Sequence, residues 1–224
     1  MHDSILELKE SGALKRRIIE VAVFAVFYFV IFTLLEQKNT DVYIFHNRLD
    51  EMIPYVPEFI IPYCLWFPYM AVSVLYFLLF DSDGTDYKRM TRPLAFGCVI
   101  FLIISFLFPN GQDLRPDDAG KGFFANIVSS LYKGDTSTNV FPSLHVYNSM
   151  AACYACLTSR ALKGHMVIKI LIAVLSVSIV LSTMFVKQHS SIDVAGGLAL
   201  NAICIAGMYL MGRGRRDKRR DESV

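Results

Sequence analysis

The stretch MVIKILIAVLSVSIVLSTMFVKQHSSIDVAGGLALNAICIAGMYLM, Met166–Met211, decides the fold. It holds two apolar runs, Met166–Val186 and Ile192–Met211, and the short polar segment between them contains Lys187 and His189. A helix that crosses the hydrocarbon core of a bilayer needs about 20 mostly apolar residues. Each run has this length, so the stretch predicts two membrane-spanning helices joined by a tight polar turn.

The remainder of the chain continues this pattern. Of its 224 residues, 54% are hydrophobic and only 19% are charged, which is more apolar than is usual for a soluble domain. The sequence therefore predicts an all-α polytopic membrane protein, in which residues 18–211 form the membrane domain between an N-terminal segment (1–17) and a basic tail (212–224). We expect six transmembrane helices, at Ile18–Leu35, Phe59–Phe80, Pro93–Phe108, Leu144–Ser159, Met166–Val186 and Ile192–Met211.

The basic residues lie where an even number of spans would place them on one side of a membrane. Four basic residues precede the first run, and the tail contains RGRRDKRR at Arg213–Arg220. The second and fourth connections are also basic, whereas the first carries four acidic residues. Because basic connections stay on the cytoplasmic side, we expect a cell-membrane protein with both termini cytoplasmic and the first, third and fifth connections outside.

Two of the outward connections are longer than simple links. Asp41–Phe59 places Ile44, Leu49 and Met52 on one helical face, which favours a short helix in the membrane interface. In the long connection between Pro109 and Pro142, the segment Phe123–Tyr132 predicts a second interfacial helix. Connections of this length are commonly functional.

Polar side chains gather on this outward face from three separate parts of the chain. Ionisable residues at membrane depth are costly and usually functional, so we expect these groups to form one site. They are Arg115 in the long connection, Ser143 and His145 at the start of the fourth span, and Lys187, His189 and Asp193 around the last turn.

The spacing of His189 and Asp193 indicates a chemical role. Residues four apart lie on one face of a helix, so the carboxylate can accept a hydrogen bond from one imidazole nitrogen and leave the other as a nucleophile or base. His145 is a second titratable group that can act as acid to the first histidine. We therefore expect His145, His189 and Asp193 to be the catalytic residues.

The remaining polar groups suit phosphate. Arg115 offers a bidentate guanidinium and Lys187 an ammonium group. Ser143 lies at an expected helix N-cap, where free backbone N–H groups bind anions. We therefore expect Arg115, Ser143 and Lys187 to bind a phosphoryl group.

Each of these residues has a structural explanation when taken singly. A histidine at a span boundary is commonly interfacial, Lys187 can extend its ammonium to the surface, and Asp193 can cap a helix. Metal binding is a second alternative, because His145, His189 and Asp193 could ligate zinc, but two cations beside that site oppose it. The five cysteines lie in apolar runs and are interpreted as packing residues.

The residues resemble the type 2 phosphatidic acid phosphatase superfamily, which comprises six-span membrane lipid phosphatases and phosphotransferases. The family carries three signatures in order, Lys-x6-Arg-Pro, Pro-Ser-Gly-His and Ser-Arg-x5-His-x3-Asp. Here RP, Arg115–Pro116, matches the end of the first signature. PSLH, Pro142–His145, matches the second, and STMFVKQHSSID, Ser182–Asp193, matches the third. The resemblance covers roughly the last half of the chain.

Three positions depart from the family pattern. The lysine of the first signature would fall at Phe108, the glycine of the second at Leu144 and the arginine of the third at Thr183. The PSLH form and the absent arginine are more similar to the branch of inositol phosphorylceramide synthase and sphingomyelin synthase. Those enzymes transfer a phospho-headgroup to a lipid alcohol instead of to water.

The resemblance implies a lipid-phosphate phosphatase at the outer leaflet. His189 would attack phosphorus and form a phosphohistidine, Asp193 would orient it, and His145 would protonate the leaving alkoxide. The implied partners are a membrane lipid phosphate and the bilayer, with no nucleic acid, metal or other cofactor. Two alternatives remain open, namely a headgroup phosphotransferase that uses ceramide or diacylglycerol as acceptor, and a non-catalytic lipid-binding membrane protein.

Overall fold

The structure, a computed structural model, describes residues 12–38 and 40–221 and is predominantly α-helical. Most of the expected N-terminal segment, residues 1–11, and the last three residues of the tail lie outside this description. The long helices are α2 (Ala13–Glu36), α4 (Ile60–Phe80), α5 (Thr85–Leu107), α7 (Leu144–Thr158), α8 (Met166–Phe185) and α9 (Ser191–Asp221). The shorter elements are β1 (Tyr43–Ile44), α3 (Arg48–Met52), the 3-10 helix η1 (Pro57–Phe59), β2 (Asn110–Gly111) and α6 (Phe123–Gly134).

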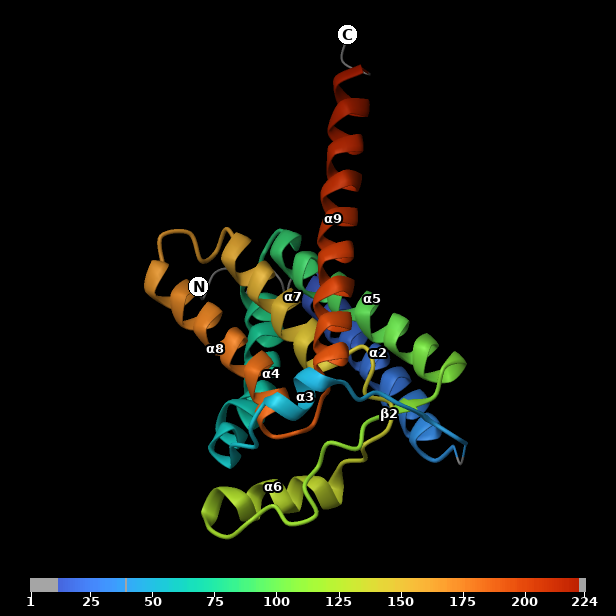
Figure 1. Cartoon of the computed structure of the whole chain (residues 1–224). Helices are drawn as coiled ribbons and strands as arrows, with labels where there is room; N and C mark the ends of the chain where they lie inside the picture. Colours follow the sequence, from blue (N-terminus) through green and yellow to red (C-terminus); the bar gives the residue numbers. More distant parts are fainter. Residues whose placement is uncertain (1–11, 39, 222–224) are drawn as a thin grey trace.

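The six long helices alternate in direction, so the bundle has two distinct ends (Figure 1). At one end, here called the basal end, Arg17 near the start of α2 donates to the carbonyl of Asp81 after α4 (2.6 Å). At the opposite loop end, the N–H of Ser143 before α7 donates to the carbonyl of Asp193 in α9 (3.1 Å). The short elements α3, α6, β1 and β2 all lie at the loop end.

Five helices in the described part of the chain are long and apolar enough to cross a membrane, which supports a multi-pass membrane protein. They are α2, α4 with the preceding η1, α5, α8 and the first part of α9. The remaining expected span corresponds to α7, which has only 15 residues. At 1.5 Å per residue this helix extends about 22 Å, less than the hydrocarbon core of about 30 Å.

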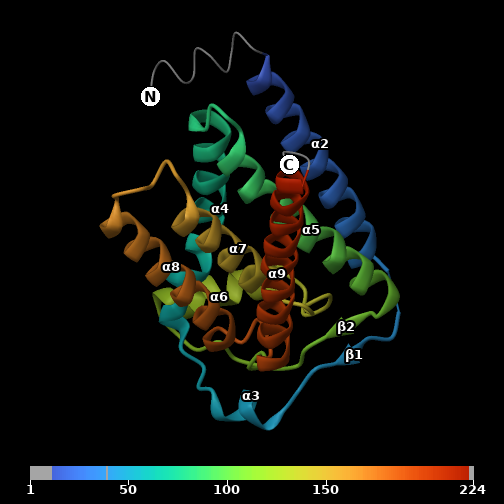
Figure 2. The same ribbon diagram turned by 90° about the horizontal axis from the view of Figure 1, so that it is seen from above.

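Helix α7 lies inside the bundle, where it packs against α4, α5, α8 and α9 (Figure 2). Small residues such as Ala152 and Ala155 let the neighbouring helices approach closely. Gly97 of α5 is required for one such contact, because a Cβ there would lie 1.9 Å from the ring of Tyr147. Most of α7 is therefore covered by other helices and not by lipid. The free thiols of Cys153 and Cys156 are buried in the same helix, which agrees with a packing role.

The connection Asp41–Phe59 differs from the expected interfacial helix. Only Arg48–Met52 is α-helical, because Asn47 forms a capping box that starts the helix at that point. Tyr43–Ile44 instead forms a strand that pairs in parallel with Asn110–Gly111. The prediction of a short helix is confirmed for Leu49 and Met52, but the prediction that Ile44 shares its face was wrong, because Ile44 lies in the strand.

A helix is present where the second one was expected, as α6. Its buried residues Ala125 and Val128 face the bundle, where Val128 belongs to a cluster with Ile60 of α4 and Val186 after α8. Phe123 at its start is largely exposed. Helix α6 thus covers the loop end with one face and leaves the other uncovered (Figure 1).

Candidate active site

The turn between α8 and α9 holds His189 in place through backbone hydrogen bonds. The N–H groups of Gln188 and His189 both donate to the carbonyl of Thr183, at 2.9 and 3.0 Å. Lys187 takes the left-handed conformation that closes the turn, with φ of 52°. The imidazole is therefore attached to a backbone that is fixed to the end of α8, and little of its side chain is exposed.

Asp193 lies one helical turn after His189 and is fully buried. Its Oδ2 lies 3.5 Å from Nδ1 of His189 and accepts a hydrogen bond from the N–H of Ser190 (2.8 Å). The carboxylate is thus close enough to orient the imidazole, although the two atoms do not form a hydrogen bond here. Catalytic hydrogen bonds are often long before substrate binds. The spacing predicted from the sequence brings these two groups together.

His145 joins them from the first turn of α7. Its ring centroid lies 5.8 Å from that of His189. Two aromatic side chains of α4 also contact the imidazole of His145, Tyr63 stacked at 4.7 Å and Trp66 tilted at 4.4 Å between ring centroids. These aromatic residues were not foreseen, because nothing in the apolar run of α4 distinguishes a side chain that faces the site from one that faces lipid.

Ser143 is the N-cap of α7, as the sequence predicts. Its Oγ accepts from the N–H of Val146 (3.4 Å). Helix α9 approaches so closely that a Cβ on Gly197 would lie 2.7 Å from the carbonyl oxygen of Ser143. The N–H groups of Leu144 and His145 have no hydrogen-bond partner in the described chain. Two backbone donors at the start of α7 are thus available beside the histidines.

Arg115 lies beside the same turn. Its guanidinium donates to Oε1 of Gln188 (2.5 Å) and to the carbonyls of Asp135 (2.8 Å) and Thr136 (2.7 Å). Burial lowers the pKa of Arg115, and the nearby Asp135 opposes this change. The side chain is therefore anchored on one side by the long connection and on the other by the residue that precedes His189.

Asp135 is a further charged group that sequence reasoning missed. Burial raises the pKa of its carboxyl, while Arg115 and His189 act in the opposite direction. Gln188 connects the two charges, because its amide nitrogen is 3.5 Å from Oδ2 of Asp135. The position of Gln188 directly before His189 was a sequence signal for a polar role at the site. It could not identify the partners of Gln188, because Asp135 and Arg115 lie 53 and 73 residues away.

Lys187 is turned toward a different part of the loop end. Its Nζ donates to the carbonyls of Asp50 (2.7 Å) and Ile53 (2.5 Å) in and after α3. Oδ1 of Asp50 also accepts from the N–H of Ser191 (2.7 Å). Burial lowers the pKa of Lys187, and Asp50 opposes this effect. The structure therefore does not bring this ammonium group together with the histidines, and uses it to attach α3 to the turn.

Two positions of the signatures that carry lysine and arginine in the resembled family are occupied here by uncharged residues, Phe108 and Thr183. Phe108 packs against the rings of Tyr43 and Phe45. Thr183 is buried, and its hydroxyl donates to the carbonyl of Val180 (2.7 Å).

Several buried polar atoms of the site have no hydrogen-bond partner in the described chain. Leaving a buried donor or acceptor unpaired costs about 1–3 kcal/mol, so such atoms indicate a place for a ligand. Of eight such atoms in the described residues, five belong to side chains at the site: Trp66 Nε1, Arg115 Nε, His145 Nε2, His189 Nδ1 and Asp193 Oδ1.

The acidic residues of the long connection do not form a cation site. Asp113 accepts from the exposed His46 (2.8 Å), and hydrogen bonds to Asp113 and Glu51 raise the pKa of that histidine. Among the described residues, no three His, Cys, Asp or Glu side chains converge on a point where a metal ion would fit.

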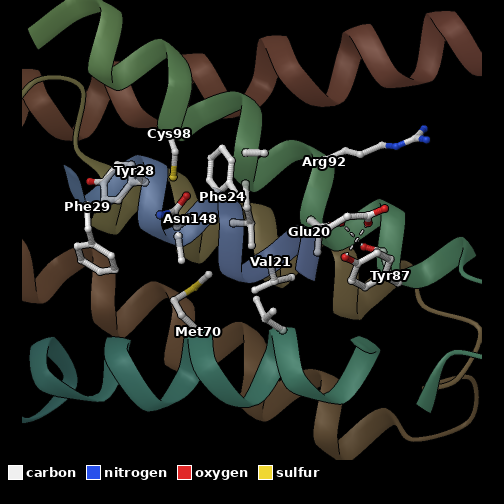
Figure 3. A pocket seen from close by; sticks show the side chains of 15 residues that line it. Glu20, Val21, Phe24, Tyr28, Phe29, Met70, Tyr87, Arg92, Cys98 and Asn148 are labelled. Carbon is white, nitrogen blue, oxygen red and sulfur yellow. Dashed lines mark hydrogen bonds between the residues drawn. The ribbon is translucent and has the colours of Figure 1, made fainter. Parts of the chain in front are cut away.

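An apolar cavity of about 400 Å³ lies between α2, α4 and α5, and Figure 3 shows its lining. Met70 lines it and is one helical turn from Trp66, which contacts His145. Asn148 of α7 reaches into it, with its Oδ1 unpaired in the described chain. A space for hydrocarbon therefore begins one turn away from the histidines.

Comparison with known proteins identifies one family. The family model described as PAP2 superfamily matches residues 94–217, more than half of the chain. The matched region contains every catalytic and phosphate-binding residue expected from the sequence. Neither the comparison with curated proteins nor that with solved structures found a significant match.

Proposed function

Because the chain belongs to the PAP2 superfamily, whose members are phosphatases or phosphotransferases that act on lipid phosphates, we propose that it hydrolyses a lipid phosphate through a phosphohistidine on His189. The observation that supports this most directly is the convergence of two imidazoles and a buried carboxylate at the loop end, with unpaired polar atoms on all three. Such a set suits a nucleophile, its orienting group and a general acid.

In the first step, Nε2 of His189 attacks phosphorus and the bond between phosphorus and the lipid oxygen breaks. Asp193 faces Nδ1 and stabilises the positive charge that develops on the ring, as the carboxylate does in a catalytic triad. His145, as imidazolium, gives its proton to the leaving alkoxide. Tyr63, stacked on the ring, and Trp66, tilted against it, hold the imidazole of His145 next to His189.

In the second step, water attacks the phosphohistidine. His145 takes a proton from the water, the bond between phosphorus and Nε2 breaks, and inorganic phosphate leaves. His189 returns to the neutral form and His145 to the imidazolium, so both histidines regain their starting states.

The phosphoryl oxygens are bound by donors that need no metal ion. The unpaired Nε of Arg115 and the free N–H groups of Leu144 and His145 supply hydrogen bonds as charge develops. Ser143 positions the two backbone donors by capping α7. Lys187 contributes by holding α3 next to the turn, and two of its three N–H donors are occupied there.

The substrate is proposed to be a lipid with long hydrocarbon chains. The apolar cavity between α2, α4 and α5 begins one helical turn from the histidine site, which would let a chain extend away from a phosphate bound there. The active site would face outward, since the loop end is opposite the basic connections that the positive-inside rule assigns to the cytoplasm.

A headgroup phosphotransferase is the second candidate. It is favoured by Thr183 and Leu144, which stand where the phosphatase signatures have arginine and glycine. In that case a lipid alcohol, and not water, would attack the phosphohistidine. A non-catalytic lipid-binding role is less well supported, because such a protein has no need to keep His145, His189 and Asp193 together.

The test uses purified protein in liposomes with chelator present. Phosphatidic acid, isoprenyl diphosphate and lysophospholipid phosphates are supplied in turn, and phosphate release is measured with and without diacylglycerol or ceramide. We expect phosphate release that chelator leaves unchanged and that His189→Ala abolishes. A new phospholipid formed only with the added alcohol would favour the transferase. Equal turnover by wild type and His189→Ala would refute the histidine mechanism.

A further inference from the structure

A second cavity lies at the basal end, between α5 and α9. Its volume is about 690 Å³. The two helices lie side by side there, as Figure 2 and the contacts between them show. The lining residues come from both helices and are Thr85, Lys88, Arg89, Arg92, Pro93, Phe96, Ile203, Cys204, Gly207 and Met208. No residue placed in the active site belongs to this groove.

The mouth of the groove carries unneutralised positive charge. Lys88 and Arg92 are one helical turn apart on α5, both are exposed, and neither has an ion pair or hydrogen bond through its side chain in the described part of the chain. Arg89 differs, because its guanidinium donates to Asp86 and to the carbonyl of Thr158. Among the residues whose side chains the structure describes, no carboxylate lines the groove.

The walls behind these cations are apolar. Phe96 and Ile203 are exposed inside a membrane-spanning region of the two helices. Gly207 leaves open space, since a Cβ built there would meet no atom within 4 Å. A soluble anion would use only the charged mouth. A molecule with a negative head and a hydrocarbon chain uses both parts of the groove.

Snorkelling explains part of this arrangement, because Lys88 and Arg92 near the end of a span can reach the interface without a ligand. It does not account for the apolar groove that adjoins these cations, which is lined by Phe96 of α5 and by Gly207 of α9.

We infer that this groove binds one anionic phospholipid of the leaflet at the basal end. Its phosphate lies between Lys88 and Arg92, and one acyl chain runs along Phe96 and Ile203 past Gly207. Each basic residue at an anionic lipid surface adds to binding. The proposed hydrolysis takes place at the opposite end of the bundle, although Arg92 also lines the cavity between α2, α4 and α5.

The test measures retention of phosphatidylglycerol by the full chain in detergent, using native mass spectrometry, with phosphatidylcholine as the neutral comparison. We expect wild type to retain one phosphatidylglycerol and Lys88→Ala/Arg92→Ala to bind it roughly 30-fold more weakly. Lys15→Ala/Lys163→Ala is the matched control, since both lysines are exposed at the basal end but do not line the groove. Equal loss in both double variants, or equal retention of phosphatidylcholine, would overturn the inference.

A second variant tests the groove without changing any charge. Gly207→Leu places a side chain in the open space and should weaken phosphatidylglycerol binding about tenfold or more, because the acyl chain is excluded. Gly134→Leu at the end of α6 adds the same side chain to open space at the loop end and should change nothing. If Gly207→Leu retains phosphatidylglycerol as wild type does, the groove is not the binding site. Gly207→Leu also tests the lipid site if Lys88→Ala/Arg92→Ala does not fold.

Discussion

The two ends of the bundle each bury a carboxylate, but the two carboxylates have very different partners. At the basal end, Asp86 accepts from the guanidinium of Arg89 (2.8 Å), the hydroxyl of Ser159 (2.7 Å) and the N–H of Arg160 (2.8 Å). At the loop end, the carboxylate of Asp193 accepts a hydrogen bond from the N–H of Ser190 (2.8 Å), and its Oδ1 has no partner in the described chain.

This difference distinguishes a buried carboxylate that stabilises the fold from one that can still interact with a substrate. A buried charge whose oxygens are all bonded stabilises one conformation, and removing it leaves its partners unpaired. A buried charge with free oxygens beside an unbonded imidazole has interactions left for a substrate or transition state. Asp86 therefore joins α5 to the end of α7, whereas the unpaired oxygen of Asp193 agrees with the catalytic role proposed for it.

The largest expected effect comes from His189. His189→Ala should lower phosphate release by about 10⁴-fold or more, because it removes the proposed nucleophile, while the melting temperature changes little. Labelled phosphate should also no longer remain on the acid-quenched protein. His165→Ala, at the start of α8 and far from the loop end, is the control and should retain wild-type turnover.

His145 should have the second largest effect. His145→Ala should lower turnover of a lipid phosphate by roughly 10²–10⁴-fold, since a general acid contributes this much. A substrate whose leaving group needs no protonation, such as a nitrophenyl phosphate, should lose much less. An equal loss on both substrates would contradict the role of acid and would favour a purely structural role in contact with Trp66.

Substitutions of Asp86 and Asp193 test the difference between the two ends directly. Asp86→Ala should lower the free energy of unfolding by about 2–3 kcal/mol, because several bonds to a charged group are lost, and the folded fraction should keep its turnover number. Asp193→Asn should do the opposite, with turnover reduced by about 10²-fold or more and little change in melting temperature. Thermal unfolding in detergent and steady-state kinetics on the same samples measure both. If both variants lose stability alone, the distinction between the two ends is incorrect.

Asp135 should have the smallest effect, and it depends on pH. Burial raises the pKa of this carboxyl in the folded state above its ordinary value of 3.8, so the folded protein binds the proton more tightly than the unfolded chain does. Stability from this group is then greatest at low pH and falls as pH rises through the raised pKa. Asp135→Asn should therefore melt at a slightly higher temperature than wild type above pH 4 and converge with it below. A constant difference at every pH would show that titration is not the cause.

The helices themselves could be predicted, because the signals are local. The apolar runs led to α2, α4, α5, α8 and α9, and Ser143 marked the start of α7 by its cap. The connection around Tyr43 could not be predicted in the same way. Its strand forms only because Asn110 and Gly111 lie beside it, 67 residues further along the chain.

The candidate site divides in the same way. The relation between His189 and Asp193 is one helical turn and is contained in the sequence, and the spacing holds in the structure. The partners of Arg115 could not be predicted from the sequence. Gln188 lies 73 residues away, and only the folding of the long connection brings Arg115 close to it. Lys187 illustrates the limit most clearly, because its sequence position suits phosphate while its ammonium contacts the carbonyls of Asp50 and Ile53.

By itself, the sequence determined the membrane-spanning class of the protein, the polar turn between the last two helices and the approach of Asp193 to His189. Length and hydropathy set the first two, and the spacing of one helical turn sets the third. Only the tertiary structure decided where Lys187 points, which aromatic residues of α4 surround His145, and that α5 and α9 leave a groove at Gly207. These features depend on which helix faces meet, and residues that lie tens to more than a hundred positions apart in the chain determine those contacts.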